Sequence, residues 1–254
     1  MSVQLSAVVI TYNEEKNIQR CLDSLQGVAD EIVVVDSYST DRTKEICTQY
    51  QVKFLEHAFE GHIEQKNWAK DQAGYDFILS LDADDALDKE LKEAILKVKE
   101  NWNAEVYSMN RLTNYCGNWI YHSGWYPDKK MRLFPKSLGE WGGVNPHDRL
   151  IVGRDTEVRH LEGNILHYSY YSREEHIAQI HKFSSIGAKA LHQQGVRSSW
   201  LKLLIKPMAR FIKNFIVFRG FLDGRDGFTI SRLSAYANYL KYSKLLKLQK
   251  GRAI

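Results

Sequence analysis

Residues 77–85 read FILSLDADD, an apolar run followed by three acids within four positions. A short continuous run such as Phe77–Leu81 is typical of a strand that is buried on both faces of a sheet. Crowded carboxylates repel one another, so Asp82, Asp84 and Asp85 need water, a cation or a positive partner to offset their charge. The stretch therefore predicts a buried strand with a charged site at its carboxyl end.

Strand and helix signals alternate through the first hundred residues around this stretch. Short apolar, β-branched runs predict strands at 5–11, 31–37, 52–57 and 76–81, and the segments between and after them predict helices at 15–26, 42–50, 62–73 and 88–100. This alternation is typical of βαβ units and a mostly parallel sheet. In such sheets, ligands bind beyond the carboxyl ends of the strands.

Polar side chains gather at three of these strand ends, in residues 11–14, 36–41 and 82–85. A single acid at such a place is often a helix N-cap, as we expect for Asp41 or Asp88, but three clusters together indicate a binding site. The sequence contains neither glycine-rich phosphate loop, G-x-G-x-x-G or G-x-x-x-x-G-K-[ST]. An Asp-Ala-Asp at a strand exit can instead hold Mg²⁺ or Mn²⁺, which bind protein and phosphate oxygens together.

The pattern changes after residue 100, and we predict three regions. Residues 1–110 form an α/β half, residues 111–172 continue the same domain, and residues 173–254 form a helical, basic, amphipathic extension. An aromatic-rich tract, 115–141, lies in the second region. Its rings suit either packing under loops or contact with the apolar faces of sugar rings, and both readings stay open.

The C-terminal extension is strongly basic. Residues 197–254 hold 13 Lys and Arg against 2 Asp and Glu, whereas residues 1–196 hold 22 basic and 29 acidic residues. In the stretch 200–222, cations interrupt the apolar run every three or four residues, so it falls short of the roughly 18 residues of a spanning helix. Pro207 should kink this helix or begin a second one. We expect contact with an anionic membrane surface, although a core helix with a solvated face is the alternative.

Other classes of partner and compartment are disfavoured. The apolar side of the extension is too bulky for a surface that binds only phosphates, so we expect no nucleic acid. The N-terminus MSVQLSAVVIT lacks the features of a signal peptide, and the three scattered cysteines fit no disulfide framework. The sequence therefore predicts a cytoplasmic protein.

Three segments carry a family resemblance: VVITYNEEKNIQRCLDSL (8–25), EIVVVDSYSTDRTKEIC (31–47) and FILSLDADD. They closely resemble the nucleotide-sugar half of family 2 glycosyltransferases, which have the GT-A fold, a Rossmann-like sheet flanked by helices. The whole chain, including FRGFLDGRDGFTISRLSAYANYLKYSKLL near its end, looks like the small transferases that add glucose to the inner core of bacterial lipopolysaccharide.

The resemblance implies that residues 1–110 are the nucleotide-sugar-binding half and residues 111–172 the acceptor-side region of the same domain. It also implies roles for individual residues. The metal motif falls on Asp82 and Asp84, with His147 as a possible third ligand and His167 equally ambiguous. The general base falls on Asp148, unless that acid only pairs with Arg149 or Arg154 on the surface. Contacts with the nucleotide sugar fall on a set from both halves of the match: Thr11, Tyr12, Glu14, Asp36, Lys66, Asn67, Asp82 and Arg132.

The resemblance also implies the reaction. We expect a metal-dependent inverting glycosyltransferase that uses Mg²⁺ or Mn²⁺ and moves glucose from UDP-glucose to a lipid-linked saccharide, at the inner face of the cytoplasmic membrane. One alternative is a sugar nucleotidyltransferase, although the glycine- and lysine-rich loop usual for a triphosphate is missing near Thr11. The other is a non-catalytic, membrane-peripheral protein that binds nucleotides.

Overall fold

The computed structural model describes residues 2–144 and 147–254, without the side chains of Val144 and His147. The chain forms two compact units. The first runs to Arg111 and includes Asp128–Tyr168, and the second combines Leu112–Pro127 with Ser169–Ile254. The second unit thus contains a segment that we had placed in the predicted acceptor-side region. The reason is packing, because Tyr115 and Ile120 are buried against Ile230 of the C-terminal helix.

The first unit is built on a mixed sheet. Strands β3 (Lys53–Glu56), β2 (Glu31–Asp36), β1 (Leu5–Thr11) and β4 (Phe77–Asp82) are parallel neighbours in that order. The sheet then continues through strands that come later in the sequence and pair antiparallel with their neighbours where a register is defined: β8 (Asp128–Pro135), β6 (Val106–Tyr115), β11 (Val158–Tyr170) and β5 (Asp85–Leu87).

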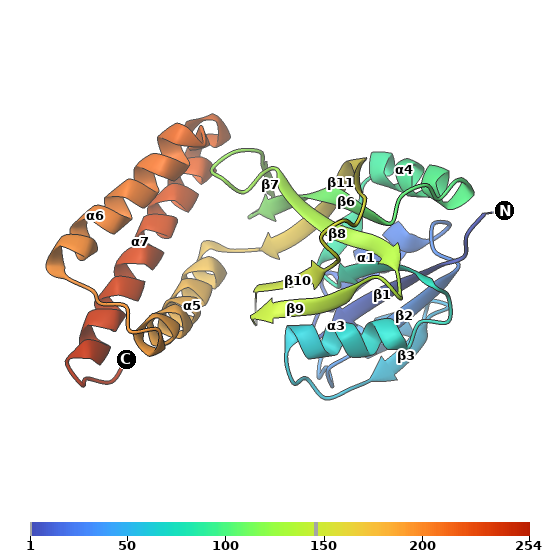
Figure 1. Ribbon diagram of the computed structural model, residues 1–254, viewed down its shortest axis with the longest axis horizontal. Coiled ribbons are helices and arrows are strands. Elements are labelled where there is room, and N and C mark those ends of the chain that lie inside the picture. Colours follow the sequence, from blue (N-terminus) through green and yellow to red (C-terminus); the bar gives the residue numbers. More distant parts are fainter. Residues whose placement is uncertain (1, 145–146) are drawn as a thin grey trace. The chain divides into compact units, whose positions relative to one another are not determined.

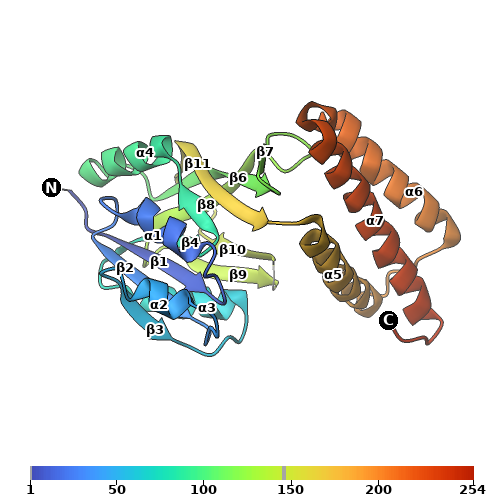
Figure 2. The same cartoon turned by 180° about the vertical axis from the view of Figure 1, so that it is seen from behind.

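Alternation along the strands gives this sheet two apolar faces. Leu5, Ala7 and Val9 pack into one buried cluster, and Val8 and Ile10 into another. The first face is covered by α1 (Ile18–Leu25), α2 (Thr43–Cys47) and α4 (Lys89–Glu100), and the second by α3 (His62–Asp71) with the hairpin of β9 (Glu140–Val144) and β10 (His147–Ile151) (Figures 1 and 2). Both faces are covered, which explains why the strands read as continuous apolar runs.

The predicted α/β class and the order of elements are confirmed, with shorter helices than expected. Asp88 caps α4 as predicted, because its carboxylate accepts a hydrogen bond from the N–H of Leu91 at 2.8 Å. The extra strand β5 was not predicted. Asp85, one of the acids of the opening stretch, is the first residue of this strand. Only 1% of the surface of Asp85 is exposed.

The second unit is mainly helical, as expected from residue 173 onward. It contains the short strand β7 (Asn118–Ile120), helices α5 (Arg173–Gln193), α6 (Trp200–Ile212) and α7 (Gly224–Gln249), and two short helical turns, η1 (Lys213–Val217) and η2 (Gly220–Asp223). Helix α7 packs against both α5 and α6. Helix α6 runs on through Pro207, so this proline does not begin a second helix. No helix in the described ranges has both the length and the apolar character to cross a membrane.

Candidate active site at the carboxyl ends of the strands

The loops after β1 and β2 are joined to each other by hydrogen bonds. The N–H of Asn13 donates to Ser39 Oγ at 2.7 Å, and the N–H of Glu14 donates to Thr43 Oγ1 at 2.8 Å. The carboxylate of Asp36 accepts hydrogen bonds from the N–H and the hydroxyl of Ser39. These bonds hold two of the three predicted polar clusters together at the edge of the sheet where β1 and β2 end.

Asp82, at the end of β4, is held by two buried cations. Lys66 of α3 lies 2.9 Å from Asp82 Oδ1, and Nη2 of Arg132 of β8 lies 3.0 Å from Asp82 Oδ2. Lys66 and Arg132 are only 2% and 3% exposed. Burial would raise the pKa of Asp82, but the positive charges of Lys66 and Arg132 outweigh it and hold that pKa well below its usual range. Asp82 therefore serves as the anionic partner of two cations.

Asp148, on β10, reaches the same lysine. Its Oδ2 lies 2.8 Å from Lys66 Nζ, so Lys66 bridges Asp82 and Asp148, two acids from distant parts of the sequence. The ring of Trp141 packs beside both cations, with Lys66 Nζ 4.6 Å and Arg132 Cζ 4.9 Å from its centroid. Asp148 thus lies in the charged cluster and not in the surface pair with Arg149 or Arg154 that was the alternative.

Asn67, next to Lys66 on α3, binds the backbone of the hairpin. Its side-chain amide donates to the carbonyl of Trp141 at 2.9 Å and accepts from the N–H of the same residue at 2.8 Å. In this arrangement Asn67 fixes β9 against α3, and its predicted contact with a nucleotide sugar stays a prediction.

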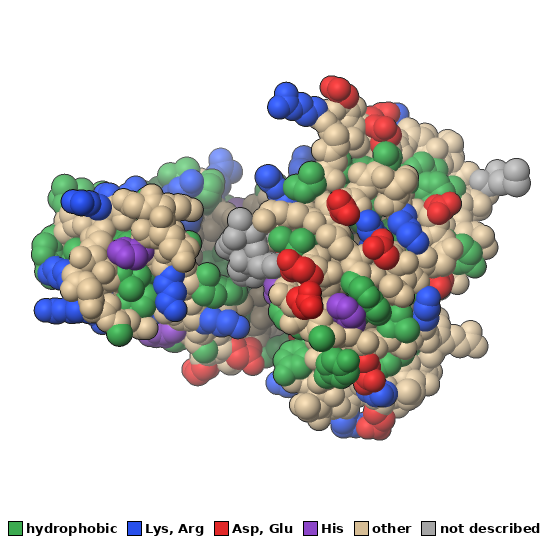
Figure 3. Space-filling model, turned by 60° about the horizontal axis from the view of Figure 1, so that its bottom comes forward, with side chains coloured by type: hydrophobic (Ala, Val, Ile, Leu, Met, Phe, Trp, Pro, Cys, Tyr) green, Lys and Arg blue, Asp and Glu red, His purple; other side chains and the backbone are tan. Residues whose placement is uncertain are grey.

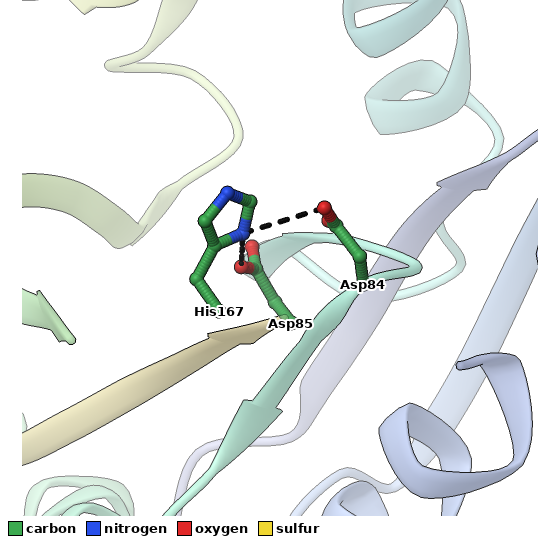
Figure 4. A group of neighbouring side chains, drawn as sticks. All are labelled: Asp84, Asp85 and His167. Atoms are coloured by element: carbon green, nitrogen blue, oxygen red, sulfur yellow. Dashed lines mark hydrogen bonds and ion pairs between the residues drawn. The ribbon is translucent and has the colours of Figure 1, made fainter. Parts of the chain in front are cut away.

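Asp84 and Asp85 form a second cluster with His167 of β11 (Figure 4). Nδ1 of His167 lies 2.9 Å from Asp85 Oδ1 and 3.4 Å from Asp84 Oδ2. The backbone N–H of Tyr168 donates to the carbonyl of Asp84 at 2.9 Å, which anchors this turn to β11. One potential ligand atom from each of the three side chains lies within 4.8 Å of the other two. Two carboxylates and one imidazole can hold a divalent cation such as Mn²⁺, which also binds phosphate oxygens.

The charge of this second cluster is unevenly offset. Burial raises the pKa of Asp84 to about 7; His167 opposes this rise, while Asp85 and Asp82 add to it by repulsion. The pKa of Asp85 is lowered, because its hydrogen bond with His167 and that residue's positive charge overcome the effect of burial. Among these acids, Asp84 is therefore the one whose negative charge the protein compensates least.

Several buried donors at this edge lack a protein acceptor. Nε and Nη1 of Arg132 are buried without a hydrogen-bond partner among the described residues, as are Thr11 Oγ1 and Trp141 Nε1. A buried unpaired guanidinium nitrogen is costly unless a ligand satisfies it. Arg132 is thus suited to an anionic ligand, and phosphate oxygens match its geometry.

Eight of the eleven predicted residues fall into three groups. Lys66, Asp82, Arg132 and Asp148 form one cluster; Asp84 lies in the other; Tyr12, Glu14 and Asp36 lie at the ends of β1 and β2. The side chain of His147, the proposed third metal ligand, lies outside the described residues. Sequence reasoning missed the pairing of Lys66 with Asp148 and left His167 undecided, since each contact joins positions 82 residues apart.

Comparison of the sequence with known proteins places this chain in a family. The model for "Glycosyl transferase family 2" matches residues 6–171. An uncharacterized glycosyltransferase of Rickettsia typhi is 30% identical over 96% of this chain and 87% of its own length. The lipopolysaccharide core biosynthesis glycosyltransferase LpsC of Rhizobium meliloti is 26% identical over 94% of this chain and 93% of its own.

One solved structure supports the fold. A mannosyltransferase from Pyrobaculum calidifontis, solved in complex with GDP-Man and Mn²⁺, superimposes with a TM-score of 0.53 and 17% identity. The match covers 97% of this chain and 88% of the mannosyltransferase. The predicted GT-A type of α/β fold is confirmed.

Proposed function

Because this chain belongs to glycosyl transferase family 2 and is a glycosyltransferase, we propose that it transfers a hexose from a nucleoside diphosphate sugar to a lipid-linked saccharide, with inversion at the anomeric carbon. We propose UDP-glucose as the donor and a lipopolysaccharide core as the acceptor. The name of the full-length relative LpsC supports the acceptor. The observation that carries the proposal is the pair of charged clusters at the end of β4, one anchored by Lys66 and Arg132 and the other formed around Asp84.

The first cluster suits the diphosphate and the incoming hydroxyl. The unpaired Nε and Nη1 of Arg132 would donate to the diphosphate of the donor and so stabilise the charge that develops as it leaves. Asp148 would accept the proton of the acceptor hydroxyl as that oxygen attacks the anomeric carbon. Lys66 would hold Asp148 in place through their 2.8 Å contact. One base is enough, because inversion takes a single displacement.

The second cluster suits a divalent cation. Asp84, Asp85 and His167 would hold it, since one potential ligand atom from each lies within 4.8 Å of the other two. The bound Mg²⁺ or Mn²⁺ would supply positive charge next to the leaving diphosphate. Exposed rings at the same edge, Tyr12 at 57% and Tyr38 at 56%, offer faces for the nucleoside base.

Calorimetric titration of UDP, with and without Mn²⁺, tests the donor site. We expect the wild-type chain to bind UDP at least tenfold more tightly with Mn²⁺, and Asp84→Asn to lose this difference. Glu90→Gln, which removes an acid from the first turn of α4, is the matched control and should keep it. Equal binding by the wild type and Asp84→Asn, or no binding by either, would refute the proposed cation site.

The second unit supports a membrane location for the acceptor. Helix α6 exposes Trp200, Leu201 and Leu204 at 65–72%, and its cations Lys206 and Arg210 are exposed as well. Figure 3 shows Lys and Arg side chains scattered among hydrophobic ones on the helical part of the molecule. Apolar and basic side chains together favour the interface of an anionic bilayer, where one set enters the acyl boundary and the other meets the headgroups.

Vesicle sedimentation tests this membrane contact. We expect binding to vesicles that contain about one third phosphatidylglycerol and much weaker binding to pure phosphatidylcholine. Leu201→Ser with Leu204→Ser should reduce binding at least tenfold. The control pair Leu96→Ser with Leu138→Ser changes exposed leucines of the first unit and should leave binding unchanged. If the two pairs behave alike, α6 is not the membrane contact.

A further inference from the structure

A pocket of about 530 Å³ lies within the second unit, and its lining includes none of the residues assigned to donor and metal. Its lining combines three arginines with two aromatic rings: Arg173, Phe221, Gly224, Arg225, Phe228, Thr229 and Arg232. The volume is in the usual range for small-ligand sites. No acidic side chain belongs to this lining.

The pocket is built mainly on one face of α7. Arg225, Phe228, Thr229 and Arg232 stand at spacings of three, four and seven residues, which place them on one side of a helix. Arg173, the first residue of α5, completes the pocket from the neighbouring helix. The segment GRDGFTISR (224–232), part of the C-terminal stretch that contributes to the family resemblance, supplies five of the seven lining residues.

The positive charge of this pocket is only partly offset. Arg173 lies 3.6 Å from Asp226, the one acid that pairs with it among the described residues. Asp226 also accepts a hydrogen bond from Asn118 at 2.8 Å. Arg225 and Arg232 have no carboxylate within ion-pairing distance in the described part of the chain. Among the described residues, no side chain forms a capping hydrogen bond at the start of α7, where Asp223 is the N-cap residue and Asp226 lies in the first turn.

The acid just before this segment, Asp223, forms no ion pair with the arginines of the pocket in the described part of the chain. Asp223 accepts hydrogen bonds from the N–H groups of Tyr121 and His122 and from the hydroxyl of Ser123, at 2.9–3.1 Å. Its side chain is 4% exposed, so it ties the loop of residues 121–123 to the start of α7. Asp223 and Asp226 thus hold neighbouring parts of the unit together, whereas Arg225 and Arg232 line the pocket.

The apolar wall continues into a cluster of aromatic rings. Phe228 meets Phe211 and Phe215 edge to face at 5.9 and 5.8 Å, and Phe221 meets Phe215 at 6.3 Å. Phe221 and Phe228 are about half exposed, at 49% and 47%. A ligand in this pocket would therefore meet both guanidinium groups and apolar rings.

We propose that this pocket binds a phosphate group carried by an amphiphilic molecule, namely the anionic glycolipid that accepts the sugar. Guanidinium groups form bidentate hydrogen bonds with phosphate. Phe221 and Phe228 would pack against the adjoining apolar part of the ligand. The identification of the ligand as the acceptor rests on the proposed function, whereas the phosphate chemistry of the pocket does not. The pocket would fix the acceptor by a group other than the reacting hydroxyl.

Titration with octyl phosphate, kept below its micelle concentration, tests the pocket directly. We expect saturable binding at least tenfold tighter than that of inorganic phosphate, and none with neutral octyl glucoside. Arg225→Gln with Arg232→Gln should weaken octyl phosphate binding at least tenfold. The control pair Lys182→Gln with Lys189→Gln removes two exposed cations of α5 that do not line the pocket and should bind as the wild type does.

Three results would overturn the proposal: unchanged octyl phosphate affinity in the double arginine variant, equal binding of octyl glucoside, or equal affinity for inorganic and octyl phosphate. Circular dichroism would check that the helices persist, which we expect because all three arginines are exposed. UDP titration with Mn²⁺ on the same variant separates the two proposals. Its failure in every variant would refute the donor site and leave the arginine result standing.

Discussion

The two units of this protein use charge in opposite ways. In the first unit, Lys66 and Arg132 are almost fully buried, and both are paired with Asp82. In the second unit, Arg225 and Arg232 are exposed and have no acidic partner among the described residues. Buried cations must be paired to be tolerated, whereas exposed ones are free to meet a partner from outside.

We relate this difference to two proposed tasks, the reaction in the first unit and the binding of lipid and anionic ligand in the second. The first unit fixes charged groups within 3 Å of one another, as suits a reaction whose charges develop at defined atoms. The second unit presents unpaired cations beside exposed apolar side chains, which suits a lipid surface and an anionic ligand. Four substitutions test the contrast, from the largest expected effect to the smallest.

Lys66→Met should have the largest effect, because it leaves the carboxylates of Asp82 and Asp148 without their shared cation. Removing one partner of a buried pair costs about 3–5 kcal/mol. Lys44→Met is the control, since its pair with Glu56 at 3.0 Å is exposed and should contribute less than about 1 kcal/mol. Urea unfolding of both variants measures the two values. Similar losses would show that the buried bridge has no special role in stability.

Asp148→Asn should lower kcat by about a hundredfold or more, near 3 kcal/mol in the barrier, because an amide cannot take the proton. Mn²⁺-dependent UDP binding should persist, since the proposed cation ligands are unchanged. Steady-state kinetics with UDP-glucose and a lipid-linked acceptor give kcat, and calorimetry gives the binding. A kcat close to that of the wild type would remove Asp148 as the base.

Gly227→Ala should destabilise the second unit by about 2–3 kcal/mol, because overpacking forces the backbone apart. A Cβ at Gly227 would come within 1.8 Å of the carbonyl oxygen of Gly220, where η2 meets α7. Gly187→Ala is the control, since its Cβ would meet only the flexible chain of Lys241 at 3.1 Å. In the helix α5 it should be neutral or stabilise by up to about 1 kcal/mol. Thermal unfolding followed by circular dichroism compares the two.

His176 should make the second unit sensitive to acid. Burial lowers the pKa of His176 to about 4, and its Nδ1 lies 3.1 Å from the hydroxyl of Tyr115. In the unfolded chain a histidine has a pKa near 6.5, so the unfolded state binds the extra proton and the folded state loses stability as the pH falls from about 6.5 to 4. Between pH 7 and pH 5 the loss should be about 2 kcal/mol.

His176→Gln should flatten this pH dependence, and His192→Asn, which changes an exposed histidine of the same helix, should leave it unchanged. Urea unfolding at pH 7 and pH 5 measures each difference. If His176→Gln keeps the full acid sensitivity, the pH dependence comes from other groups.

Much of the fold was predictable, because it depends on local patterns. Continuous apolar runs predicted the strands and a period of 3.6 residues predicted the helices, and together they gave the order of elements. The cap at Asp88 was predicted from its residue type and position. Two features were not. Strand β5 is only three residues long and pairs with β11, far along the chain. Residues 112–127 join the second unit because Tyr115 and Ile120 pack on Ile230.

The sequence by itself determined that acids stand at the carboxyl end of a buried strand, because strand burial and strand direction follow from the order of residue types. Only the tertiary structure decided which group offsets each acid. Asp82 meets Lys66 and Arg132, while Asp84 and Asp85 meet His167. The interaction of two charges depends on their separation in space and on their burial. Neither quantity follows from the number of residues that separates them in the sequence.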